Sequence, residues 1–171
     1  PGHFSGVALI ILKFLNLIQP HFLTLGQKDY QQTLVIKELI KDFFFKTKVI
    51  ILPTYRENNG LALSSRNQLI CDKKQHLTKM IFDTLNTIAF DIEKFGLKKN
   101  KINSLRLKLL KLGFEKVNYI EVLKEESLSK LDSVPSKCRI FISMTLDGVR
   151  LIDNIAVRKR LVKQKGFIKT V

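Results

Sequence analysis

The 171-residue chain has few of the residues that stabilise secreted or metal-bound folds. Its two cysteines, Cys71 and Cys138, lie far apart, and neither has metal-ligand spacing with any of the three histidines. This argues against a disulfide framework and gives a structural zinc site no support. We therefore expect no metal-binding side-chain cluster and a reducing, cytoplasmic location.

Long apolar runs are missing as well. The densest one, over residues 7–18, is interrupted by Lys13 and Asn16 and is shorter than the roughly 20 residues that a membrane span needs. The same segment lacks the charged start and small-residue cleavage site of a signal peptide. With only 4 prolines, 8 glycines and 45% hydrophobic residues, the composition predicts a globular protein of one domain or two small ones, without a membrane span.

Positive charge, in contrast, is abundant, with a formal net charge of +15. Six basic residues and no acidic residue fall in the last stretch, 158–171. Elsewhere lysines alternate with acids and lack interleaved aromatics, which is typical of a solvated surface. We therefore do not expect nucleic acid to bind. A basic nucleic-acid-binding module is the alternative, and its binding would follow the tail and fall steeply with salt.

The first part of the chain has the pattern of a strand–helix–strand unit. Helical spacing predicts an initial helix with Ser5 as its N-cap, ended by Pro20. A strand over 21–25 follows, and a second amphipathic helix begins near Asp29. The short apolar run over 49–52 is typical of a fully buried strand in a parallel sheet. Two parallel strands joined by a helix form a right-handed crossover.

The second part of the chain predicts a mixed helix and sheet structure. Helical spacing covers 72–95 and 100–112, and alternating patterns predict strands over 117–122 and 139–144. Asp147-Gly148 is a strong turn signal for an antiparallel hairpin. The sequence therefore predicts an α/β fold in which a parallel sheet is followed by a smaller α+β domain with antiparallel strands.

Two clusters of phosphate-compatible residues follow the two predicted parallel strands. The first is Gly26-Gln27-Lys28-Asp29-Tyr30-Gln31-Gln32, and the second runs from Gly60 to Asn67 and contains Ser64-Ser65-Arg66. Glycine lets backbone amides approach a polyphosphate, lysine and arginine neutralise its charge, and serine hydroxyls donate hydrogen bonds. Ligands of parallel sheets bind beyond the carboxyl ends of the strands. The sequence therefore predicts a nucleotide site at one sheet edge.

The segments PGHFSGV, GQKDYQQ and PTYRENNGLALSSRN, all within residues 1–67, resemble the pantothenate synthetase (pantoate:beta-alanine ligase) family. The resemblance covers most of this chain but only the later part of a full enzyme. It implies a Rossmann-like sheet that is incomplete on its N-terminal side, because an earlier segment with a His-x-Gly-His signature is not in this chain. The domains implied are 1–70 for the later part of the nucleotide-binding domain, 71–157 for the α+β domain, and 158–171 for a basic tail.

The resemblance implies an ATP-dependent ligase that condenses pantoate with beta-alanine through a pantoyl adenylate and releases AMP and pyrophosphate. ATP and Mg²⁺ would be its cofactors, and a homodimer its assembly. We expect the chain by itself to be inactive, and a catalytically dead remnant is a second alternative.

The resemblance also assigns individual residues. The implied ATP-binding residues are His3, Gly26, Gln27, Lys28, Asp29, Tyr55, Leu63, Ser64, Ser65 and Arg66. Of these, Lys28 and the Ser64-Ser65-Arg66 run would be catalytic, by stabilising charge that develops on the phosphates. Gln32 would hydrogen-bond pantoate. From the residues alone, His3 could instead be a local cap or surface residue at a helix start, Lys28 and Asp29 a surface ion pair, and the serine loop a polar connector.

Overall fold

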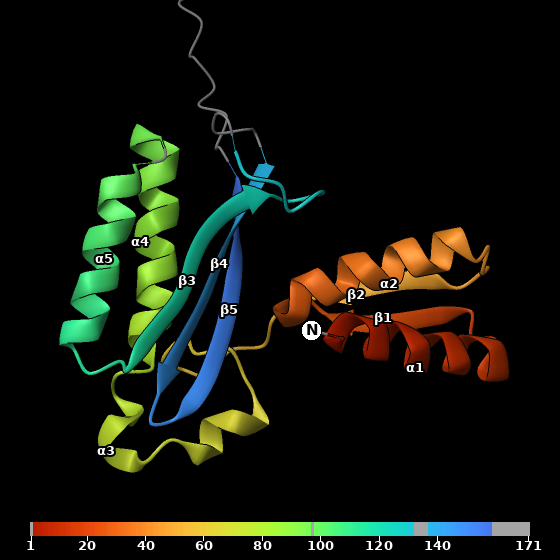
Figure 1. Cartoon of the computed structure of the whole chain (residues 1–171), viewed down its shortest axis with the longest axis horizontal. Helices are drawn as coiled ribbons and strands as arrows, with labels where there is room; N and C mark the ends of the chain where they lie inside the picture. Colours follow the sequence, from red (N-terminus) through yellow and green to blue (C-terminus); the bar gives the residue numbers. More distant parts are fainter. Residues whose placement is uncertain (1, 97, 132–136, 159–171) are drawn as a thin grey trace, which may run out of the picture.

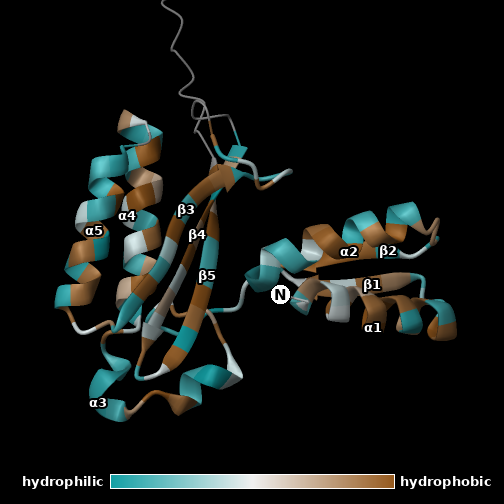
Figure 2. Ribbon diagram, in the orientation of Figure 1, coloured by the Kyte–Doolittle hydropathy of each residue, from teal (hydrophilic) through white to brown (hydrophobic). Residues whose placement is uncertain are grey.

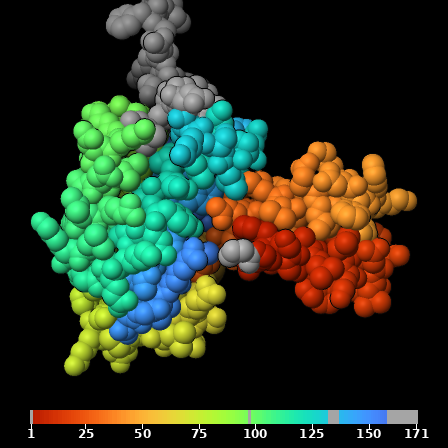
Figure 3. Space-filling model, viewed as in Figure 1, coloured from red at the N-terminus to blue at the C-terminus, as the bar shows by residue number. Residues whose placement is uncertain are grey.

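The computed structural model describes residues 2–96, 98–131 and 137–158. Figure 1 shows two modules, an N-terminal module of residues 3–52 and a C-terminal module of residues 72–158. In the space-filling view the N-terminal module projects from one side of the C-terminal module (Figure 3). The predicted basic tail lies, from residue 159 onward, outside the described residues. Within the described ranges, no helix is both long and apolar enough to cross a membrane.

The N-terminal module is built on two parallel strands. Its elements are α1 (His3–Ile18), β1 (Phe22–Gly26), the 3-10 turn η1 (Gln27–Asp29), α2 (Tyr30–Asp42) and β2 (Lys48–Leu52). Strands β1 and β2 pair in parallel, which confirms the predicted strand–helix–strand unit. The small core of this module consists of Leu15 of α1 with Ile36, Leu39 and Ile40 of α2.

Only one face of this two-stranded sheet is covered by the helices. Alternate side chains such as Leu23 and Val49 pack against the core of α1 and α2, as the period of a strand requires. The opposite face leaves three apolar side chains between 42% and 59% exposed, namely Phe22, Ile50 and Leu52. The expectation of a fully buried strand over 49–52 is therefore wrong, because no described element packs on that second face.

The start of α1 also differs from the expectation. The helix begins at His3, with Gly2 at the N-cap position and no side-chain cap. Ser5 lies inside the first turn, so its expected capping role is wrong. A glycine with φ of 84° makes the sharp entry into the helix instead, a conformation that glycine adopts at little cost.

The C-terminal module is an antiparallel sheet covered on one face by helices. Its elements are α3 (Asp72–Gln75), α4 (Lys79–Phe95), α5 (Lys99–Lys111), β3 (Lys116–Lys124), β4 (Lys137–Leu146) and β5 (Val149–Arg158), with sheet order β3-β4-β5. Residues Ile140, Ile142 and Met144 of β4 lie in the main core together with Ile81, Leu85 and Ile88 of α4. The single helix expected over 72–95 is two helices, separated by a turn over 76–78 where Asn59 Nδ2 donates to Thr78 Oγ1 at 3.1 Å.

The hairpin between β4 and β5 confirms the turn predicted at Asp147-Gly148. Both residues have positive φ, 56° and 71°, as a primed two-residue turn requires. One carboxylate oxygen of Asp147 accepts the Cys71 backbone N–H at 2.9 Å, and the other accepts Lys74 Nζ at 3.0 Å. These bonds, the Cys71 backbone bond first, lower the pKa of Asp147 to about 2.

The lowered pKa makes this contact dependent on pH. In the unfolded chain an aspartate has a pKa of about 3.9. The charged Asp147 carboxylate therefore contributes its full stabilisation above that pH, and the contribution is lost as the pH falls to about 2 and the carboxylate is protonated. We expect Asp147→Asn to lower the free energy of unfolding at pH 6 and to have little effect near pH 2. Urea unfolding of both proteins across this range measures the difference, and an equal difference at both ends would contradict the assignment.

Candidate nucleotide-binding site

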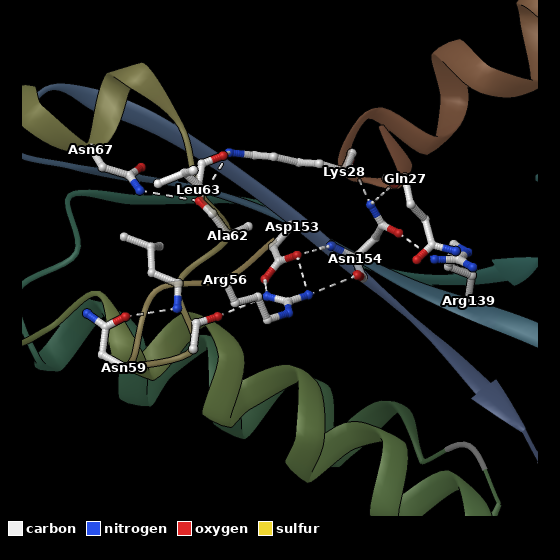
Figure 4. A network of polar contacts seen from close by, with 12 residues as sticks. Gln27, Lys28, Arg56, Asn59, Ala62, Leu63, Asn67, Arg139, Asp153 and Asn154 are labelled. Atoms are coloured by element: carbon white, nitrogen blue, oxygen red, sulfur yellow. Dashed lines mark hydrogen bonds and ion pairs between the residues drawn. The ribbon is translucent and has the colours of Figure 1, made fainter. Parts of the chain in front are cut away.

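The turn between β1 and α2 brings the first predicted cluster to the second. Gly26 ends β1, and residues Gln27–Asp29 form the single 3-10 turn that leads into α2. From this turn Lys28 Nζ donates to the carbonyls of Ala62 at 3.2 Å and Leu63 at 3.0 Å, as Figure 4 shows. The two clusters therefore meet at the carboxyl edge of the parallel strands.

The loop over residues 53–64, which carries the second cluster, is folded back on itself and packed on α4. Gly60 has φ of 88°, and a Cβ there would lie 2.4 Å from the ring of Phe82. Both facts require glycine at this position. The side chain of Asn59 fixes the same loop. Its Oδ1 accepts the Leu61 N–H at 2.9 Å, and its Nδ2 donates to Thr78 Oγ1 at 3.1 Å.

Two adjoining cavities lie where the modules meet. The larger, of about 530 Å³, is lined by five of the predicted residues: His3, Lys28, Asp29, Gln32 and Arg66. The smaller, of about 300 Å³, is lined by Leu63, Ser64 and Ser65 together with Lys28, Asp29 and Arg66. Eight predicted residues are thus brought together.

Gly26, Gln27 and Tyr55 line neither of these two cavities. A side chain at Gly26 would meet nothing within 4 Å, so the space beside this residue is open to a ligand. The side chain of Tyr55 is exposed, and its carbonyl accepts the Leu63 N–H at 2.9 Å. The backbone carbonyl of Gln27 accepts a hydrogen bond from Asn154 Nδ2 at 3.2 Å.

The C-terminal sheet supplies a wall of the larger cavity that the sequence reasoning missed. Its lining residues are Tyr119 of β3, Phe141 of β4, and Arg150, Ile152, Asp153 and Asn154 of β5. From the sequence, these strands were expected to form a separate domain without a binding role. The available signal was the acid–amide pair Asp153-Asn154 inside the otherwise apolar run 151–157 of β5, since buried polar groups need specific partners.

Asp153 holds the loop of the second cluster through Arg56. The guanidinium donates to the two carboxylate oxygens at 2.6 and 3.0 Å, and the Asp153 side chain is 1% exposed. Arg56 also stacks on Phe82, 4.2 Å from the ring centroid, and donates to the Gly60 carbonyl at 2.9 Å. A two-pronged ion pair of this kind fixes orientation as well as distance.

Asn154 holds the turn of the first cluster. Its Nδ2 donates to the carbonyls of Gln27 and Lys28, the latter at 2.7 Å. Its Oδ1 accepts Arg139 Nη1 at 2.6 Å, and the buried Arg139 is paired with Glu125 at 2.6 Å. Neighbouring residues of β5 therefore fix both predicted clusters to the C-terminal sheet (Figure 4).

The electrostatic environment of Lys28 is that of an anion site. Burial lowers the pKa of Lys28, with smaller opposing effects from Asp29 and Asp153 and further lowering by Arg66 and Arg56. Desolvation and like charges both disfavour the protonated amine. A bound polyanion would offset both effects, so the arrangement favours a negatively charged ligand.

Magnesium is a cofactor that the sequence resemblance implies, and the carboxylates that line the cavities decide whether the site can accept it. Among the described residues, no group of three or more His, Cys, Asp or Glu side chains could hold a metal ion. Mg²⁺ usually keeps several waters and binds through substrate phosphates with one or two carboxylates. Of the carboxylates that line the two cavities, Asp153 is paired with Arg56 and Asp29 remains, so a magnesium ion that enters with a nucleotide would be held mainly by its phosphates and by water.

Comparison with known proteins gives the family. The family model described as pantoate-beta-alanine ligase matches residues 1–156. The chain belongs to this family. The pantothenate synthetase of Francisella tularensis subsp. mediasiatica is 40% identical over 155 residues, covering 90% of this chain and 50% of the relative. That of Buchnera aphidicola subsp. Schizaphis graminum is 42% identical over 161 residues, covering 90% and 54%.

Solved structures agree with this membership. The pantothenate synthetase of Thermus thermophilus aligns with a TM-score of 0.82 at 30% identity, over 92% of this chain and 57% of that one. The Francisella tularensis ligase, solved with beta-gamma ATP and beta-alanine, aligns with a TM-score of 0.70 at 37% identity, over 91% and 51%. The family resemblance and the predicted fold class are confirmed, and the chain spans about half the length of the pantoate-beta-alanine ligases that it matches.

Proposed function

We propose that this chain forms the part of a pantoate-beta-alanine ligase that binds the phosphates of ATP and the pantoate substrate. The observation that carries the proposal is the meeting of Lys28 with the Ser64-Ser65-Arg66 loop beside one cavity. The Francisella relative solved with beta-gamma ATP and beta-alanine supports it. A homodimer in the cytoplasm is part of the same proposal.

In the first chemical step, a carboxylate oxygen of pantoate attacks the α phosphorus of ATP, and the bond to the pyrophosphate oxygen breaks. Negative charge accumulates on the phosphate oxygens. Lys28 Nζ already donates two hydrogen bonds to carbonyls, so its remaining N–H is available to a phosphate. Arg66 and the hydroxyls of Ser64 and Ser65 would donate to the same oxygens. Magnesium bound with ATP would neutralise further phosphate charge.

The other predicted residues would orient the reactants. Gln32 would donate its amide to pantoate, and Asp29 would accept from the ribose. The backbone at Gly26 and Gln27, with His3, Tyr55 and Leu63, would frame the nucleotide. In the second step the amine of beta-alanine attacks the carbonyl carbon of the pantoyl adenylate, and the bond to AMP breaks. The chain would thus act mainly through orientation and electrostatic stabilisation.

ATP titration of the chain with and without Lys28 tests this proposal. We expect saturable binding by the natural sequence and at least tenfold weaker binding by Lys28→Ala, since a hydrogen bond from a charged group contributes roughly 1.5–3 kcal/mol. Lys111→Ala removes the same charge at the end of α5, away from both cavities, and should leave the affinity unchanged. Isothermal titration calorimetry measures all three proteins.

The same titrations separate the alternatives. A nucleic-acid-binding module would bind an RNA duplex more tightly than ATP and would lose affinity equally with either lysine substitution. Absence of ATP binding at millimolar nucleotide would reject the proposed function for this chain.

A further inference from the structure

One face of β5 presents three alternating side chains to the larger cavity. Arg150, Ile152 and Asn154 are two residues apart, so they lie on the same face of the sheet, and all three line the cavity. Asn154 fixes the turn that contains Lys28, and Ile152 is apolar. Among the described side chains on this face of β5, Arg150 is the one cation that lines the cavity.

Arg150 lies where the two cavities adjoin. It lines both of them, as do Lys28, Asp29 and Arg66. The wall shared by both cavities therefore contains three cationic side chains and one carboxylate. The positive charges of these side chains repel one another, and solvent screens the repulsion in part. A bound anion would offset it.

Arg150 is exposed, and its pairing differs from that of the partly buried Arg56 and the buried Arg139. Arg56 is paired with Asp153 and Arg139 with Glu125. Within the described part of the chain, Arg150 has no ion-pair partner, and its single side-chain hydrogen bond runs from Nε to Ser143 Oγ at 3.0 Å. The two terminal amino groups are thus accessible to a ligand, while the bond to the buried Ser143 ties Nε to the sheet.

We propose that Arg150 is a phosphate-binding residue of the nucleotide site, contributed by the C-terminal module to a polyphosphate held between it, Lys28 and Arg66. This inference rests on the proposed function. A guanidinium offers paired donors that match phosphate oxygens. Phosphate is favoured over the pantoate carboxylate because Arg150 also lines the smaller cavity, where Ser64 and Ser65 add two hydroxyl donors.

Titration with three ligands tests the role of Arg150. ATP and inorganic tripolyphosphate should each bind Arg150→Gln at least tenfold more weakly than the natural sequence, whereas adenosine, which lacks phosphates, should bind both equally. Arg150→Lys keeps the charge but not the paired donors, so its affinity for tripolyphosphate should lie between the two. Lys111→Gln is the matched control for the loss of one positive charge. Thermal unfolding of each variant verifies that it is folded.

Each outcome decides between the two proposals. If Arg150→Gln binds ATP as tightly as Lys111→Gln does, while Lys28→Ala weakens it, the role of Arg150 is refuted and the nucleotide site stands. If pantoate binding falls but tripolyphosphate binding does not, Arg150 binds a carboxylate and the phosphate assignment is wrong. If the natural sequence binds neither ATP nor tripolyphosphate, both proposals fail. Should Arg150→Gln be unfolded, an Arg150→Lys affinity equal to that of the natural sequence would overturn the requirement for paired donors.

Discussion

Asp153→Ala should destabilise the chain by about 3–5 kcal/mol, the range for breaking a buried ion pair by removing one partner. The substitution leaves Arg56, whose side chain is 19% exposed, without its carboxylate. It also removes the acceptor of the Asn154 N–H at 2.7 Å. Urea unfolding at neutral pH measures the loss, which should be accompanied by weaker ATP binding, since Arg56 holds the loop that leads to Ser64.

A double substitution separates charge burial from packing. Replacing both partners, as Arg56→Met with Asp153→Leu, removes the desolvated charges together and should cost less than Asp153→Ala alone. Glu38→Ala removes one partner of the exposed pair with Lys41 and should change stability by less than ~1 kcal/mol. If Asp153→Ala were as mild as Glu38→Ala, the pair would not contribute to the stability of the fold.

Local signals in the sequence predicted most of the elements because they depend on neighbouring residues. The helix expected over 100–112 is α5 at Lys99–Lys111, and the strand expected over 139–144 is the centre of β4 at Lys137–Leu146. The turn at Asp147-Gly148 was predictable because few residues accept positive φ at both positions. The break between α3 and α4 was not, because it depends on contacts of Thr78 with Asn59, a residue 19 positions earlier.

The site was predictable only where the connectivity of the sheet brings residues together. Parallel strands joined by a helix place both ends at one edge, so Lys28 and the loop near Leu63 were expected to meet. The contact of Asn154 with Lys28 spans 126 positions, and no local pattern encodes it. The polar pair Asp153-Asn154 in β5 indicated that buried partners exist but did not identify them. Nothing in the sequence around Arg150 distinguished it from a surface arginine beside a turn.

The N-terminal module exposes two apolar surfaces that the described residues leave uncovered. On α1, Ile10, Phe14 and Leu17 share one helical face and are 51–83% exposed. The second surface is the open face of the sheet, with Phe22, Ile50 and Leu52. Figure 2 shows both α1 and β2 largely in the hydrophobic colour. Exposed apolar patches of this kind mark interaction surfaces in folded proteins.

Pantothenate should not form when this chain alone is supplied with ATP, pantoate and beta-alanine. Catalysis requires the phosphate-binding side chains to be held close to their productive positions. A two-stranded sheet that is open on one face lacks the packing that would hold them there. The chain also spans only about half of the Francisella relative. Adding a polypeptide for the remaining half of that relative should cover the open face and restore turnover, measured as AMP release that depends on beta-alanine.

Two variants test whether the apolar surfaces mediate this association. Ile50→Lys places a charge on the open face and should abolish both the complex, measured by analytical ultracentrifugation, and the restored turnover. Leu107→Lys makes the same kind of change on α5, at a side chain that is 60% exposed, and should affect neither. Turnover by the chain alone would show that the described residues already contain a complete site. Association that persists undiminished in Ile50→Lys would place the contact elsewhere, because a lysine ammonium buried in an apolar interface without a partner costs several kcal/mol.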